Sequence, residues 1–185
     1  MVAVATIRKA GLALGAVAAA AVMAFGVANT HGGAEAAPAK GAVYVLSNQA
    51  VNSVLVYERN PDGSLDAAGS VPTGGAGTGA GLGSQGSIVL SENGHYLFAV
   101  NAGSNDITSF EVTSHGLEAV DRVPSGGVRP TSITNDGDTV YVLNAGGTGN
   151  ITGFNVDHGD LEMIPGSTRP LSGGATNPAQ VQFSP

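Results

Sequence analysis

The chain has 185 residues, with 7 Lys and Arg against 14 Asp and Glu, a formal net charge of −7 and no cysteine. Nucleic acid is excluded as an expected partner, because phosphate binding needs clustered Lys and Arg. The absence of cysteine excludes disulfides, thiolate catalysis and cysteine–metal sites, so packing and hydrogen bonding must stabilise the fold.

The N-terminal residues 1–36 have the pattern of a signal peptide. Arg8 and Lys9 form a basic region, and an uncharged apolar run follows over 10–28. Small residues allow cleavage after Ala28 or after Ala36, and we favour the second. The mature chain would then be 37–185, secreted or located in the periplasm or cell envelope, with no membrane contact after cleavage. A retained membrane anchor is the alternative, because the run is almost long enough to span a bilayer.

Five landmarks recur three times after residue 41. They are a β-rich run ending in a polar residue, a second run ending in an aromatic residue, a glycine turn before a leucine, a third strand ending in small residues, and a short apolar run. The first runs are 43–47, 97–101 and 140–144. Their aromatic residues are spaced by 54 positions (44 to 98) and then 43 (98 to 141). A glycine-rich insert at 74–86 explains the longer first interval.

Each repeat predicts four short antiparallel strands, and four-stranded units at this period are typical of β-propeller blades. We therefore predict an all-β fold, with a coincidentally spaced antiparallel sandwich as the alternative. We expect the short apolar run of one unit to be the innermost strand of the next blade, so that blade one lacks its own. The predicted blades are about 42–75, 86–127 and 130–174, with the start of a fourth at 178–185. Three blades would not close a ring, which predicts the N-terminal part of a longer propeller.

The segments 94–101 and 140–144, together with Ser184-Pro185, resemble the lactonase family of seven-bladed propellers. That family includes 6-phosphogluconolactonase-type enzymes and carboxymuconate cyclases. The resemblance implies about three of seven blades, and hydrolysis of a sugar-type or carboxylated lactone by the full-length protein. The family often places a histidine after Pro-x where an inner strand starts, and 85–87, 130–132 and 178–180 lack one. This difference favours the alternative, a non-catalytic propeller that binds a small molecule or a protein.

Propeller ligands bind where inner strands start and loops converge. The residues predicted to lie there, and so to bind a small-molecule lactone or another anionic ligand, are Gln85, Ser87, Arg129, Ser132, Asn177 and Gln180. Arg129 is the strongest candidate, because cations are scarce and its guanidinium suits a carboxylate or phosphate. A surface salt bridge is the alternative role. No acid–base pair for catalysis is identified.

Other motifs predict little chemistry. The segment Gly81–Gly86 spells G-x-G-x-x-G, but a β-rich run follows it where a nucleotide site needs a helix, so we expect a flexible loop. The histidines show no metal spacing, and we expect no metal and no cofactor. His115 and His158 lie at matching turns, and a solvated hairpin is favoured over a cation loop at 157–160. The segment 150–152 is a glycosylation sequon, and Asn101 and Asn144 are expected to hold turns.

Overall fold

The computed structural model describes residues 41–172 and 177–184. The chain divides into two compact units, residues 1–35 and 36–185, and all described residues belong to the second. The predicted signal peptide and its cleavage sites therefore lie outside the described residues. In the described part, no helix has the length and apolar character needed to cross a membrane.

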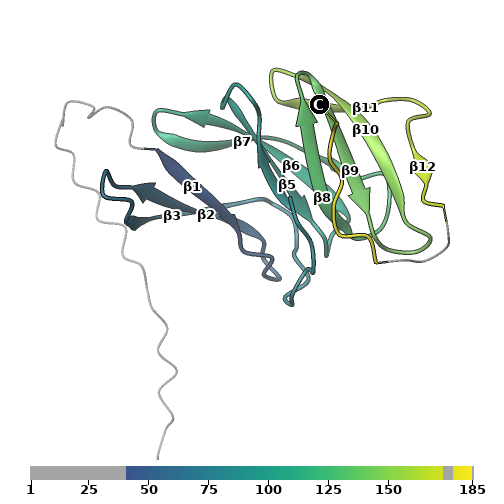
Figure 1. Ribbon diagram of the computed structural model, residues 1–185, viewed down its shortest axis with the longest axis horizontal. Helices are drawn as coiled ribbons and strands as arrows, with labels where there is room; N and C mark the ends of the chain where they lie inside the picture. The colour runs from purple at the N-terminus through teal and green to yellow at the C-terminus, as the bar shows by residue number, and fades with distance from the viewer. Residues whose placement is uncertain (1–40, 173–176, 185) are drawn as a thin grey trace, which may run out of the picture. The chain divides into compact units, whose positions relative to one another are not determined.

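The described secondary structure consists of strands in three antiparallel sheets (Figure 1). Sheet 1 has the order β1 (Ala42–Leu46), β2 (Ser53–Arg59), β3 (Leu65–Pro72). Sheet 2 has the order β4 (Ile88–Leu90), β5 (Tyr96–Asn101), β6 (Asp106–Thr113), β7 (Gly116–Pro124). Sheet 3 has the order β8 (Pro130–Asp136), β9 (Thr139–Asn144), β10 (Asn150–Asp157), β11 (Asp160–Met163), and β12 (Arg169–Pro170) also pairs with β10. The predicted all-β, antiparallel fold is confirmed.

The short apolar runs pair with the strands that follow them in sequence, as expected. β4 hydrogen-bonds to β5 and β8 to β9, so each run opens the following sheet. The predicted run 180–183 is different, because 177–184 contains no strand. It lies against sheet 3 instead, where the rings of Phe183 and Tyr141 meet edge to face at 5.7 Å.

Sheet 2 lies between two apolar clusters. Phe98 and Val100 of β5 pack with Phe154 and other residues of sheet 3, whereas Leu97 and Ala99 pack towards sheet 1. Successive strand residues point to opposite faces, so a strand buried on both faces needs an uninterrupted apolar run. This explains why β5 reads Leu-Phe-Ala-Val rather than alternating with polar residues.

The glycine-rich segment 74–86 is anchored at its start by backbone hydrogen bonds. The N–H of Gly77 donates to the carbonyl of Gln49 at 2.8 Å, and the N–H of Gly103 donates to that of Ala76 at 2.8 Å. Leu82 packs against the apolar cluster between sheets 2 and 3. The segment leads into β4, so the G-x-G-x-x-G pattern meets a strand, as expected, and not a helix N-terminus.

Candidate functional site

The connections between strands leave the sheets at two opposite ends. We call one the hairpin end, formed by the turns at 60–64, 91–95, 114–115, 137–138 and 158–159. We call the other the loop end, formed by 47–52, 73–87, 102–105, 125–129 and 145–149. Backbone hydrogen bonds join neighbouring loops at this second end, from Gly77 to Gln49 and from Gly103 to Ala76.

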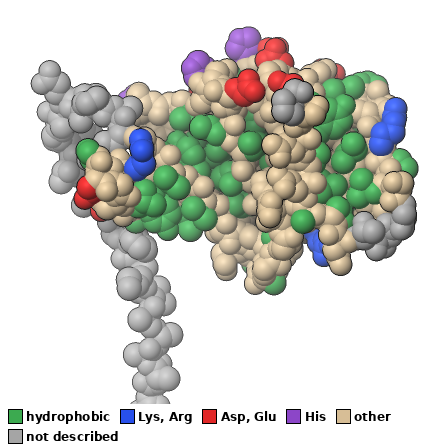
Figure 2. All heavy atoms as spheres, in the orientation of Figure 1, with side chains coloured by type: hydrophobic (Ala, Val, Ile, Leu, Met, Phe, Trp, Pro, Cys, Tyr) green, Lys and Arg blue, Asp and Glu red, His purple; other side chains and the backbone are tan. Residues whose placement is uncertain are grey.

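Charge is distributed unequally between these two ends. The hairpin end carries Asp62, Glu92, Asp138, His95, His115 and His158, and Figure 2 shows acidic and histidine side chains gathered along one edge over the hairpins. The loop-end segments contain no Asp or Glu, and Arg129 is their one charged residue. A negatively charged ligand is therefore favoured at the loop end over the hairpin end.

Arg129 is exposed at the loop end, directly before β8. Its backbone is left-handed, with φ of 54°, and its N–H donates to Oδ1 of Asn105 at 2.7 Å. Its guanidinium donates to Oδ1 of Asn177 at 3.2 Å. Within 41–172 and 177–184, ion pairs join Arg122 to Asp106 and His158 to Asp157, and none involves Arg129. The guanidinium is thus available to a ligand.

The structure brings the three predicted inner segments together, but it gives their residues different roles. The N–H of Gln85 donates to the carbonyl of Ala179 at 2.9 Å, and the N–H of Val181 donates to Oγ of Ser132 at 3.1 Å. Ser132 is fully buried, so its hydroxyl serves this junction.

The other predicted site residues are less constrained. The carbonyl of Ser87 accepts the N–H of Val100 at 3.0 Å, which extends the β4–β5 pairing. Gln85, Asn177 and Gln180 are exposed. Arg129 is hydrogen-bonded to Asn177, so these two exposed residues are the part of the predicted set that the structure brings together.

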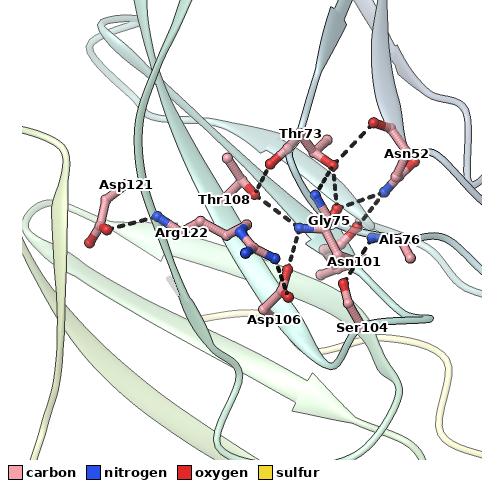
Figure 3. Close-up of polar contacts among 11 residues, drawn as sticks. Asn52, Thr73, Gly75, Ala76, Asn101, Ser104, Asp106, Thr108, Asp121 and Arg122 are labelled. Atoms are coloured by element: carbon pink, nitrogen blue, oxygen red, sulfur yellow. Dashed lines mark hydrogen bonds and ion pairs between the residues drawn. The ribbon is translucent and has the colours of Figure 1, made fainter.

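Sequence reasoning missed a buried polar network between sheets 1 and 2 (Figure 3). Its centre is the amide of Asn101, whose Nδ2 donates to Asp106 at 2.7 Å and to Thr108 at 2.9 Å. Its Oδ1 accepts from Oγ1 of Thr73 at 2.6 Å and from Nδ2 of Asn52 at 2.9 Å. The prediction that Asn101 holds a turn captured only the bond to Asp106.

Arg122 closes this network at the edge of the sheets. Its guanidinium pairs with Asp106 at 2.9 Å, beside an open cavity of about 330 Å³ lined by parts of β3, β6 and β7 and by the start of the 73–87 loop. Asp121 also lines the cavity, but its carboxylate accepts the N–H of Leu161 in sheet 3 at 3.0 Å. The carboxylate of Asp106 balances the charge of the Arg122 guanidinium, so this cavity has no positive excess and does not suit an anion.

The groups with shifted pKa lie away from Arg129. Burial raises the pKa of the Tyr44 hydroxyl in the packing between sheets 1 and 2. Hydrogen bonds from the hydroxyl and backbone N–H of Ser64 lower the pKa of Asp62 at the hairpin end. Neither group can supply acid or base chemistry to a ligand held at the loop end.

The remaining motifs are accounted for by local structure. Nδ1 of His158 lies 2.7 Å from a carboxylate oxygen of Asp157, and both side chains are about 90% exposed, in a solvated hairpin. Across the described ranges, no three His, Asp or Glu side chains could hold a metal ion. The sequon lies inside β10, where Asn150 accepts from Nδ2 of Asn144 at 2.8 Å and Thr152 is buried.

The family model described as "Lactonase, 7-bladed beta-propeller" matches residues 36–174. No relative was found among curated proteins. A 6-phosphogluconolactonase-like protein of Bacteroides fragilis matches with 22% identity and a TM-score of 0.59, over 78% of this chain and 42% of its own. The periplasmic gluconolactonase of Pseudomonas aeruginosa matches with 20% identity and a TM-score of 0.51, over 77% and 44%.

A protein of Lactobacillus plantarum matches with 23% identity and a TM-score of 0.54, over 65% of this chain and 37% of its own. The chain spans less than half the length of these three structures, and at such identities they establish the fold alone. The family match covers most of the chain and agrees with the sheets described above. The chain belongs to the lactonase family of seven-bladed β-propellers.

Proposed function

We propose that the loop end of these blades binds a small anionic lactone or the acid derived from it, with Arg129 as the main ligand-binding residue. The observation that carries the proposal is the exposed guanidinium of Arg129, without a carboxylate partner in the described residues, at the end of the sheets whose loop segments contain no Asp or Glu. A charge-assisted hydrogen bond from such a group is worth about 1.5–3 kcal/mol.

The proposed role of these blades is binding. Lactone hydrolysis needs water to attack the ring carbonyl carbon, the ring C–O bond to break, and a proton to reach the leaving oxygen. A positioned base or a Lewis acid must assist that attack. Arg129 can hold a phosphate or carboxylate of the substrate, and Asn177 fixes the direction of its guanidinium. The activity of the whole protein is a proposal that rests on its family.

The second candidate function is a propeller that binds a ligand without turning it over. Two observations favour it. The inner segments 85–87, 130–132 and 178–180 contain no His, Asp or Glu, and the Ser132 hydroxyl, a possible nucleophile, is buried and accepts the N–H of Val181. Under this alternative, Arg129 would still select an anion, because the contact to the guanidinium does not depend on hydrolysis.

The family neighbours supply a matched pair of test substrates. 6-Phosphogluconolactone and gluconolactone share the lactone ring and differ in a charged phosphate. We expect Arg129→Ala in the full chain to raise KM for the phosphorylated lactone about tenfold or more, because a charge-assisted contact is lost. KM for the neutral lactone should change little. Raised ionic strength should weaken the binding of the phosphorylated lactone and leave that of the neutral lactone unchanged.

Arg169→Ala is the matched control. Arg169 is also exposed, but its guanidinium donates to the carbonyls of Gly166 and Thr168 in its own segment. If Arg129→Ala changed the kinetics of both lactones equally, or of neither, the assignment of Arg129 would be wrong. Wild-type protein that turned over neither lactone above the uncatalysed rate, yet bound 6-phosphogluconate, would establish the non-catalytic alternative.

A further inference from the structure

The two junctions between sheets use equivalent positions but different hydrogen bonds. Asn52 stands directly before β2, and Asn105 stands directly before β6. At the first junction, Nδ2 of Asn52 crosses to sheet 2 and donates to Oδ1 of Asn101 at 2.9 Å. At the second junction, Asn105 instead accepts the backbone N–H of Arg129 at 2.7 Å.

The second junction also contains an unsatisfied group in the interior. Asn144 is the equivalent of Asn101 in the next repeat, it is fully buried, and its Oδ1 has no hydrogen-bond partner among the described residues. The packing around the two amides is otherwise alike. A Cβ on Gly75 would lie 2.4 Å from Cγ of Asn101, and a Cβ on Gly127 would lie 2.6 Å from Cγ of Asn144. The second junction lacks both donors, because Asn105 binds Arg129 and Oγ of Ser125, the counterpart of Thr73, donates to the carbonyl of Gly127 at 3.3 Å.

Arg129 needs to be held, because a left-handed backbone is unfavourable for a residue with a long side chain. Its N–H is bound to Asn105, its carbonyl accepts the N–H of Ala145 at 2.9 Å, and its guanidinium is bound to Asn177. Strained conformations persist where surrounding contacts over-determine them, and they concentrate at functional positions. Asn105 is itself left-handed, with φ of 61°, which asparagine tolerates.

We infer that Asn105 is a positioning residue for ligand binding. Its side-chain oxygen holds the backbone of Arg129 in the conformation that presents the guanidinium at the loop end, and its amide does not donate to Asn144 as that of Asn52 donates to Asn101. The inference rests on the proposed role of Arg129 in binding an anion. It adds that the anion site is built by sheet 2 as well as by sheet 3, because Asn105 belongs to the β5–β6 loop and Arg129 precedes β8.

The experiment is a double-mutant cycle on the full chain, with 6-phosphogluconate as the probe and calorimetric titration as the readout. Asn105→Gly removes the acceptor and keeps the left-handed backbone accessible, so the fold should survive. We expect Arg129→Ala to weaken binding about tenfold or more, and Asn105→Gly about threefold to tenfold. In the Arg129→Ala background, Asn105→Gly should have no further effect, because it acts through the guanidinium.

A second readout follows the hydrogen bond itself. The amide hydrogen of Arg129 should exchange faster in Asn105→Gly, while the amides of β5 and β6 keep their protection. If Arg129→Ala bound the probe as tightly as wild type, the proposed function would fail. If Arg129→Ala weakened binding but Asn105→Gly did not, or weakened it equally in both backgrounds, the proposed function would stand and the positioning role would be overturned.

Discussion

Asn101 and Asn144 occupy the same position in successive repeats, so alanine at each provides a matched pair of perturbations. The Asn101 side chain makes four hydrogen bonds, one of them to the carboxylate of Asp106. At about 1 kcal/mol for each neutral bond and about 1.5–3 kcal/mol for the bond to a charged group, its loss should cost about 4–6 kcal/mol. The Asn144 side chain makes two neutral bonds, to Ser125 and Asn150, and its loss should cost about 2 kcal/mol or less.

The cost at Asn144 is reduced further because alanine also removes its unsatisfied acceptor. The expected difference of about 3 kcal/mol separates the urea midpoints by about 1–3 M, for slopes of about 1–3 kcal/mol per M. Circular dichroism and tyrosine fluorescence can follow the unfolding, since the chain contains no tryptophan. Asn155→Ala, an exposed change on β10, is the control and should be close to neutral. Equal urea midpoints for Asn101→Ala and Asn144→Ala would refute the expectation that the loss of stability follows the number of hydrogen bonds removed.

Two further predictions concern the glycine-rich loop and the N-terminus. Gly77→Ala should lower Tm by about 3–10 °C, because its Cβ would lie 2.3 Å from the backbone of Asn48, whereas Gly81→Ala, with open space around it, should leave Tm unchanged. A thermal melt that ranked the two variants alike would contradict the packing of this loop. Exported protein should begin near Asn29 or Ala37, and Edman sequencing that returned Met1 would contradict the signal-peptide prediction.

The fold could be predicted because its determinants are local. Each of them acts within one repeat. They are strands with alternating or continuous apolar residues, a glycine at a tight hairpin and an aromatic residue at a fixed offset. Gly63, Gly116 and Gly159 all have positive φ, as the turns before the leucines required. The same local logic explains the prediction for Asn144, whose amide does bond across its turn to Asn150.

The polar network could not be predicted because its partners belong to different repeats. Thr73 and Asn52 lie 28 and 49 positions before Asn101, and no local pattern shows that their side chains meet. The burial of Ser132 could not be predicted from the sequence for a related reason. Its location beside an inner strand suggested ligand contact, whereas the chain segment that covers it, around Val181, comes from the far end of the sequence.

The left-handed residues show why Arg129 points to function rather than to folding alone. Fourteen glycines in the described ranges have positive φ, together with Asn48, Asn105, Arg129 and His158. Asparagine and histidine are enriched in this conformation, so three of these four residues need no special explanation. Arginine is not enriched there, and this chain has 29 glycines that show how readily its turns accept glycine. A glycine at 129 would relieve the strain and keep the N–H that donates to Asn105, so backbone structure alone does not explain the arginine, and this supports the proposed binding role of its side chain.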